Sequence, residues 1–330
     1  MTGFAPLANF VTLSWNSPGS KDRGCFIMKD LDMDRRQLIG LSAALAVVGI
    51  TRAAAKDREA VMFRIGAIAD AQYADEEDAG ARMYRRTPAK LEQAVTTLNA
   101  VGIDFAVHLG DFIDGDEKSY GTVLPLIGKL NCPVRFVLGN HDFAVPEERK
   151  RLLPQRLGMP GRYYSFDHKG WLFVVLDGND LSTYGWPAGS AEDLESRKIH
   201  AGKYPNAPTW DGGIGPAQLL WLDKTLTAAD NAGQKVALFC HFPIAPENPH
   251  NLWNANDIIS HIAPHASVKL WLNGHNHDGN YGVVSGIHCL NLKGMLDTEE
   301  TSYAVLSFYT DKIAVKGYGR EGDRTLHLRP

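Results

Sequence analysis

Along residues 63–277, short runs of apolar residues alternate with segments in which apolar residues recur every three or four positions. Short runs are typical of buried strands, and the wider spacing is typical of amphipathic helices. We predict helices at residues 87–101, ended by Gly102, and at 216–228. We predict strands at residues 63–69, 103–109, 134–138, 171–176, 235–240 and 268–272. This alternation of strands and helices favours an α/β architecture in one domain.

Five of these strands run directly into a short cluster of Asp, Asn, Gln or His residues. The clusters begin at Asp70, Asp111, Asn140, His241 and His275. In α/β sheets, ligands bind in the crevice beyond the carboxyl ends of the strands. Taken singly, each cluster also has a structural explanation, such as turn chemistry for Asn or a core histidine for His241. Five such clusters together predict a binding site.

The residue types in the clusters are those of a metal centre. The candidate ligands are Asp70, Gln72, Asp111, Asn140, His241, His275 and His277. Carboxylate, amide and imidazole donors suit Mn, Fe, Zn or Co, and the lack of thiolates disfavours a purely structural zinc site. Two such ions, about 3.5–4 Å apart, activate water and clamp the oxygens of a phosphoryl displacement. The clusters therefore predict a site for two divalent metal ions.

In this order, the clusters resemble the five sequence blocks of the calcineurin-like metallophosphoesterase superfamily. The blocks are Asp70-Ala71-Gln72, Gly110-Asp111 with Asp114, Gly139-Asn140-His141-Asp142, His241, and Gly274-His275-Asn276-His277. Most of that superfamily has His at the position of Gln72. Gln at this position, followed by an acidic stretch at 75–78, is similar to the manganese-dependent ADP-ribose/CDP-alcohol diphosphatase family. The resemblance extends over residues 63–325.

The resemblance implies a fold and a set of ligand roles. The fold is a four-layer α/β/β/α sandwich of two mixed sheets flanked by helices. Manganese is the expected metal, with Fe, Zn or Co as alternatives. One ion would be held by Asp70, Gln72 and His277, the other by Asn140, His241 and His275, and both by Asp111.

The resemblance also implies residues that act on the substrate. His141 lies next to a ligand and would stabilise the phosphoryl group as an imidazolium or protonate the leaving group. Asp114 would accept a hydrogen bond from it, although a turn carboxylate is the alternative. Tyr84 and Arg85 are candidate phosphate contacts, with a solvated arginine as an equal alternative. Trp253 and Asn254 are candidates for stacking on and binding a nucleobase.

The implied reaction is hydrolysis of a phosphoanhydride in a nucleoside diphosphate-linked substrate such as ADP-ribose or a CDP-alcohol. The alternatives are a phosphodiesterase, including one for cyclic nucleotides, and a phosphomonoesterase of the same superfamily. A non-catalytic binding protein would be a different class, but it has no need of an acid such as His141. The expected partner is a small phosphate compound, and the oligomeric state is left open.

Composition excludes several other classes. The chain has 330 residues, with 34 Lys and Arg against 38 Asp and Glu, so no basic stripe for nucleic acid is expected. Four cysteines without a C-x-x-C pair exclude a disulfide-dense scaffold and a zinc finger.

The N-terminal region has the pattern of an export signal. Arg35 and Arg36 precede a 13-residue apolar run at 38–50 and a small-residue end at 53–55. Adjacent arginines resemble a twin-arginine signal, and the run is shorter than the roughly 20 residues that span a bilayer. We therefore assign 1–32 to an upstream segment, 33–55 to the signal and 56–330 to a periplasmic catalytic domain without stable membrane association. An amphipathic or buried N-terminal helix, which would leave the protein in the cytoplasm, is the alternative.

Overall fold

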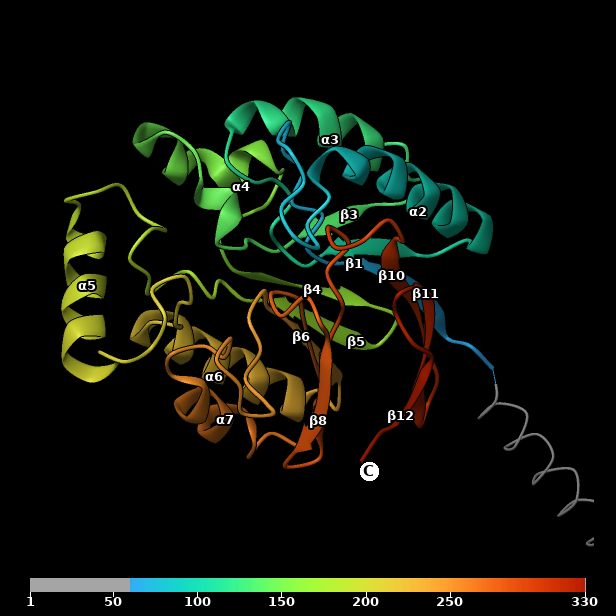
Figure 1. Ribbon diagram of the computed structural model, residues 1–330. Coiled ribbons are helices and arrows are strands. Elements are labelled where there is room, and N and C mark those ends of the chain that lie inside the picture. Colours follow the sequence, from blue (N-terminus) through green and yellow to red (C-terminus); the bar gives the residue numbers. More distant parts are fainter. Residues whose placement is uncertain (1–59, 330) are drawn as a thin grey trace, which may run out of the picture. The chain divides into compact units, whose positions relative to one another are not determined.

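The computed structural model describes residues 60–329, which form two six-stranded β-sheets packed face to face with helices on the outer sides (Figure 1). The predicted α/β/β/α sandwich is therefore confirmed. The segment 1–32 and the predicted export signal at 33–55 lie outside the described residues. Within residues 60–329, no helix combines the length and apolar character needed to span a membrane.

The first sheet has the strand order β12-β11-β10-β1-β2-β3. Its parallel half consists of β1 (Phe63–Ile68), β2 (Phe105–His108) and β3 (Val134–Phe136). Its antiparallel half consists of β10 (Ser302–Phe308), β11 (Lys312–Gly319) and β12 (Arg324–His327). Helices α2 (Thr87–Val101) and α3 (Tyr120–Ile127) cover the outer side of this sheet (Figure 1).

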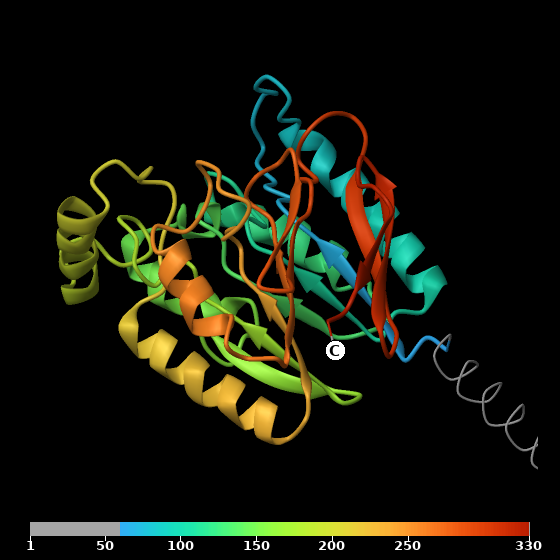
Figure 2. The same ribbon diagram turned by 90° about the horizontal axis from the view of Figure 1, so that it is seen from below.

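The second sheet has the strand order β4-β5-β6-β7-β9-β8. Its strands are β4 (Tyr164–His168), β5 (Trp171–Val175), β6 (Lys235–Phe239), β7 (Val268–Asn273), β8 (Asn280–Val284) and β9 (Ile287–Asn291). The four central strands, β5, β6, β7 and β9, run parallel to one another. Helices α6 (Pro216–Asn231) and α7 (Ala255–Ile262) cover its outer side, which faces the viewer in Figure 2.

Alternating side chains along the strands point to opposite faces of each sheet and contribute to two hydrophobic cores. Phe63 on β1, Phe173 on β5 and Phe308 on β10 point between the sheets, where the rings of Phe63 and Phe308 stack at 4.5 Å. The intervening residues of β5, Leu172 and Val174, pack instead against the buried faces of α6 and α7. The central strands β5, β6, β7 and β9 are thus buried on both faces, which explains the continuous apolar runs that β5, β6 and β7 show in the sequence.

Shorter elements lie in the connections. They are α4 (Leu153–Arg156), α5 (Ala191–Lys203) and the 3-10 segments η1 (Tyr84–Arg86), η2 (Glu117–Ser119), η3 (His141–Phe143) and η4 (Glu147–Leu152). The six predicted strands correspond to β1, β2, β3, β5, β6 and β7, and both predicted helices form, α6 extending three residues past its predicted end. Six strands, β4 and β8 to β12, and the helices α3, α5 and α7 were not predicted. Strands β4, β8, β11 and β12 have an exposed face and therefore do not form a continuous apolar run. Strands β9 and β10 are buried along almost their whole length and were missed nonetheless.

Candidate metal centre

The predicted ligands follow the carboxyl ends of strands from both sheets. Asp70 and Gln72 follow β1, Asp111 follows β2, and Asn140 follows β3. From the second sheet, His241 follows β6, and His275 and His277 follow β7. Parallel strands end at the same edge of a sheet, so their loops meet there, as the α/β rule requires.

The backbone is strained at four of the predicted ligands. Asp70, Gln72, Asp111 and His275 have φ angles of 52°, 40°, 54° and 71°. Residues other than glycine seldom adopt this left-handed conformation, and each such residue costs on the order of 1–3 kcal/mol. The surrounding fold maintains the strain, which turns these side chains sharply out of their strands toward one another.

Glycines in the blocks make room for the ligands. A Cβ atom at Gly139 would lie 2.1 Å from Oδ1 of Asp111, and one at Gly274 would lie 2.5 Å from Oδ2 of Asp70. In both cases a ligand from another strand occupies the space that a side chain would fill. The glycines before Asn140 and His275 therefore permit this close approach of two loops.

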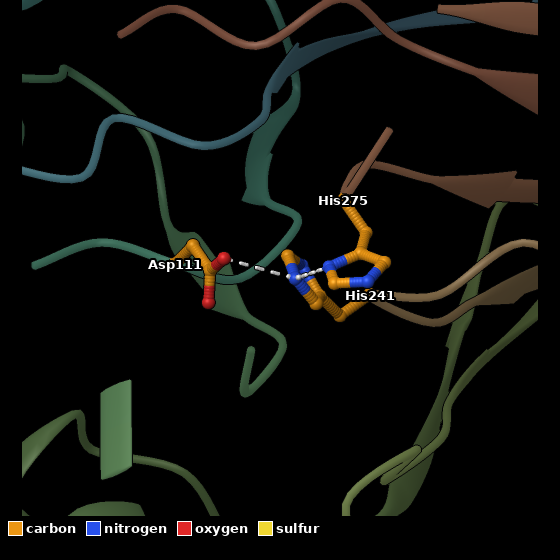
Figure 3. A group of neighbouring side chains, drawn as sticks. All are labelled: Asp111, His241 and His275. Carbon is orange, nitrogen blue, oxygen red and sulfur yellow. Dashed lines mark hydrogen bonds and ion pairs between the residues drawn. The ribbon is translucent and has the colours of Figure 1, made fainter. Parts of the chain in front are cut away.

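The central ligands lie within contact distance of one another. Nε2 of His241 is 3.1 Å from Oδ2 of Asp111, 3.2 Å from Oδ1 of Asn140 and 3.2 Å from Nδ1 of His275. Figure 3 shows Asp111, His241 and His275 converging, and one ligand atom from each lies within 4.8 Å of the other two. On the other side of this group, Oδ1 of Asp70 is 3.7 Å from Nε2 of His277 and 3.9 Å from Nε2 of His241.

Each of the three histidines is oriented by a hydrogen bond from its outer nitrogen. Nδ1 of His241 donates to the backbone oxygen of Leu109 at 2.8 Å. Nε2 of His275 donates to Oδ1 of Asp211 at 2.7 Å, and Nδ1 of His277 donates to Oδ1 of Asp297 at 3.1 Å. Neutral imidazoles bonded in this way point the lone pair of the other nitrogen into the cluster, as ligating histidines do.

Gln72 supplies the clearest sign that the cluster accommodates cations. Its Nε2 donates to Oδ2 of Asp111 at 3.2 Å, whereas its Oε1 is buried without a hydrogen-bond partner. Burying a carbonyl oxygen costs free energy unless a hydrogen-bond donor or a cation lies against it. Together with the inward lone pairs of the histidines, this oxygen makes a donor set that fits two divalent ions.

The charges of the cluster lead to the same conclusion. Burial raises the pKa of Asp70 and raises the pKa of Asp211 to about 8. Burial acts against a charge on His241, but Asp111 and then Asp70 outweigh it and raise the pKa of that imidazole to about 9. Buried carboxylates therefore attract positive charge to this position, which divalent ions would supply.

Asp142 holds the second and third blocks together. It is fully buried, and its two oxygens accept hydrogen bonds from the backbone nitrogens of Asp111, Phe112 and Gly139 and from the hydroxyl of Tyr120, all at 2.9–3.0 Å. Burial, followed by the charge of Asp111, raises its pKa to about 6. Asp142 belongs to the third block, but its sequence position predicted no role for it.

His141 lies beside the ligands and is paired with Asp114. Its Nδ1 is 2.7 Å from Oδ1 of Asp114, and its backbone nitrogen donates to Oδ1 of Asp111 at 2.8 Å. Burial would lower the pKa of His141, but the charge of Asp111 and the hydrogen bond with Asp114 outweigh it, so the pKa is raised. The structure thus places these two side chains in the arrangement predicted for a positioned acid.

A pocket of about 380 Å³ opens onto the cluster. It is lined by Gln72, Arg82, Asp111, Asn140, His141, Trp210, His250, His275 and His277. Three of these residues, Arg82, Trp210 and His250, were missed by the sequence analysis. Trp210 is exposed and His250 lies outside the five blocks, so neither residue stands out by spacing.

The structure gives the four predicted substrate contacts other partners. Tyr84 is buried beside Leu296. The guanidinium of Arg85 is exposed to solvent and pairs with Asp75 and Glu77. The arginine that lines the pocket is Arg82.

Trp253 and Asn254 also serve the fold. Nε1 of Trp253 donates to the backbone oxygen of Pro208, and its ring packs against His200 at 4.6 Å. The amide of Asn254 bonds both the backbone nitrogen and the backbone oxygen of Ile214. Both residues line a separate cavity of about 640 Å³.

An α/β/β/α sandwich with buried carboxylate, amide and imidazole donors at the strand ends defines the class of metallophosphoesterases, which are dinuclear metal-dependent hydrolases. Residues 63–279 match the sequence model of the calcineurin-like phosphoesterases, and the chain belongs to this family.

Similar proteins agree with this classification. The chain is 34% identical to the manganese-dependent ADP-ribose/CDP-alcohol diphosphatase of Arabidopsis thaliana, over 78% of this chain and 95% of that protein. It is 30% identical to the protein of the same name from Xenopus laevis, over 83% and 93%. The crystal structure of a dimetal phosphatase from Danio rerio superposes with a TM-score of 0.76 at 30% identity, over 82% of this chain and all of that one.

Proposed function

We propose that the protein hydrolyses the phosphoanhydride bond of a nucleoside diphosphate-linked substrate, of the ADP-ribose or CDP-alcohol type, with two manganese ions. The observation that carries this proposal is the first block, Asp70-Ala71-Gln72, in a chain that spans nearly the full length of relatives named for that activity. A neutral amide oxygen is a hard donor, which suits manganese better than it suits zinc.

The ligand roles are those that the family resemblance implies, and the convergence of Asp111, His241 and His275 supports them. Asp70, Gln72 and His277 would hold one ion, Asn140, His241 and His275 the other, and Asp111 would contact both. When bound, two such ions supply an activated water molecule and neutralise charge on the phosphoryl group.

The remaining residues of the pocket bind the substrate and move a proton. With Nδ1 engaged by Asp114, His141 presents Nε2 to the pocket, where it donates a proton or a hydrogen bond to the departing phosphate. Arg82 presents a guanidinium suited to the second phosphate of an anhydride. Trp210, half exposed at the rim, offers an aromatic face to the nucleoside.

One assay separates the proposed reaction from its alternatives. Protein reloaded with Mn²⁺ is tested against ADP-ribose, CDP-choline, a cyclic nucleotide, bis-p-nitrophenyl phosphate and p-nitrophenyl phosphate. We expect the highest kcat/KM for one of the two anhydrides, and no activity after dialysis against a chelator. A higher value for a diester or monoester would assign the protein to the corresponding alternative, and no hydrolysis of any substrate would indicate a binding protein.

We also propose that residues 33–55 are a twin-arginine export signal and that the mature enzyme is periplasmic. This proposal is supported by the arginine pair, the short apolar run and the small-residue end of the sequence. Export after folding suits a site for weakly bound Mn²⁺, because the ion can be loaded before metals of higher affinity compete.

A further inference from the structure

The segment Gly294–Thr298, after β9, connects the first and last blocks of the metal centre. Its backbone nitrogens donate to the backbone oxygens of two block residues, Gly294 to His277 at 3.1 Å and Leu296 to Asp70 at 2.9 Å. Met295 donates to Ala69, just before the first block, at 2.9 Å. The same segment carries Asp297, whose carboxylate accepts the hydrogen bond from Nδ1 of His277. The conformation of this segment therefore sets the orientation of the His277 ring.

Lys90 fixes this segment from the side of α2. Its side chain is buried, with 4% exposed, and its Nζ donates to the backbone oxygens of Met295 and Leu296, both at 2.9 Å. Nζ also donates to the backbone oxygens of Asp297, at 3.3 Å, and Thr298. An ammonium has three hydrogens, so four consecutive carbonyl groups must curve around one nitrogen to share them.

Arg320, just after β11, also holds the segment. Its Nη1 donates to the backbone oxygens of Gly294 at 3.0 Å and Asp297 at 3.3 Å. Its Nη2 donates to the backbone oxygen of His277 at 3.3 Å, and Nη1 lies 3.9 Å from Oδ2 of Asp297. One cation thus bridges the segment directly to the last block, while the other fixes its curvature.

We propose that Lys90 and Arg320 are positioning residues that set the affinity of one metal ion by holding Asp297 against His277. This inference rests on the proposed role of Asp70, Gln72 and His277 as ligands of one ion. A carboxylate that accepts the outer hydrogen of a ligating histidine fixes its ring and makes it a stronger donor. If the carboxylate moves, the histidine loses both effects.

The main test is Mn²⁺ titration of metal-free Lys90→Met by calorimetry. Methionine keeps the length of the side chain but donates no hydrogen bond. We expect about 10- to 100-fold weaker binding at one of the two sites, the range typical of lost partners of metal ligands, with the other site unchanged. Activity should return when Mn²⁺ is raised to saturate the weakened site.

Lys235→Met is the matched control, because Nζ of Lys235 also donates to a backbone oxygen, that of Thr310. Lys235 lies at the start of β6, at the end of the strand that is far from His241. This variant should bind Mn²⁺ as the wild type does. Equal weakening in both lysine variants would overturn the proposal.

A double-mutant cycle with Asp297→Asn separates positioning from general destabilisation. If Lys90 acts through Asp297, Lys90→Met should weaken Mn²⁺ binding little further once Asp297→Asn is present. Fully additive losses would contradict the proposal. If Lys90→Met does not fold, Arg320→Met is measured in the same cycle with the same expectation.

His277→Ala distinguishes failure of this inference from failure of the ligand assignment. If His277→Ala binds Mn²⁺ as tightly as the wild type, the assignment of His277 as a ligand is wrong. If His277→Ala loses one site but neither Lys90→Met nor Arg320→Met weakens it, the ligand role stands and the positioning role is refuted.

Discussion

At the scale of single residues, His141 is the group of the pocket best placed to exchange a proton with a substrate. Its pairing with Asp114 at 2.7 Å fixes the ring and favours the protonated form. We expect His141→Ala to lower kcat by at least about 10²-fold, the usual contribution of a positioned acid. The metal content of the purified variant, measured by mass spectrometry, should remain that of the wild type, and its loss would instead make His141 a ligand.

The variant Asp114→Asn refines this test. Asparagine can still accept the hydrogen bond from Nδ1 of His141, but it no longer stabilises the imidazolium by charge. We expect a smaller loss of kcat than in His141→Ala. A loss as large as that of His141→Ala would show that the charge of Asp114 is essential to the reaction.

Gln72 is the residue on which the narrower functional assignment depends. Its unpartnered Oε1 is a neutral donor, and histidine tolerates the left-handed conformation at this position better than most residues do. Gln72→His should therefore fold, bind metal more tightly at this site and shift the preference toward Zn²⁺ or Fe.

The same variant should also change the ratio of kcat/KM for ADP-ribose to that for bis-p-nitrophenyl phosphate at fixed Mn²⁺, because the ion at this site orients the phosphoryl group. An unchanged ratio together with an unchanged metal preference would mean that Gln72 has no part in specificity.

At the scale of elements, the connection between β1 and α2 determines which arginine lines the pocket. Residue 82 pairs with residues 79 and 297 along the backbone, and its side chain is directed into the pocket, 3.9 Å from Asp114. Arg85, in η1 just before α2, is turned outward and paired with acidic residues of the same connection. The spacing of the arginines in the sequence does not distinguish them.

This difference predicts opposite outcomes for two matched variants. Arg82→Ala should raise KM for ADP-ribose about 10- to 100-fold, since a charged hydrogen bond to phosphate contributes roughly 1.5–3 kcal/mol. Arg85→Ala should change KM by less than about twofold, because exposed ion pairs contribute little. Steady-state kinetics of both variants decide the matter, and a greater effect at Arg85 would contradict the assignment of Arg82.

At the scale of the whole molecule, the sequence of the N-terminal region predicts the cellular compartment of the enzyme. The double variant Arg35→Lys/Arg36→Lys keeps the positive charge but removes the arginine pair. We expect it to remain in the cytoplasm with residues before Lys56 uncleaved, as judged by cell fractionation and N-terminal sequencing. Cleaved periplasmic protein in the same amount as the wild type would exclude the twin-arginine assignment.

The sequence by itself determined the class of the fold and the set of candidate ligands. A strand that is buried on both faces consists of consecutive apolar residues. The sequence therefore predicts the ends of β1, β5, β6 and β7 to within a residue or two. The loops that follow them carry polar residues with no structural need for such a combination. The sequence alone therefore groups Asp70, Asp111 and His241 as ligands.

The tertiary structure alone decided which other residues join the ligands. Asp211 bonds His275 across 64 positions of the sequence, and Asp297 reaches His277 through a segment that Lys90 fixes from more than 200 positions away. Such pairs carry no local periodicity, because their spacing depends on how the loops of two sheets fold back at one edge. The way the loops fold back also explains why Arg82 lines the pocket and Trp253 does not.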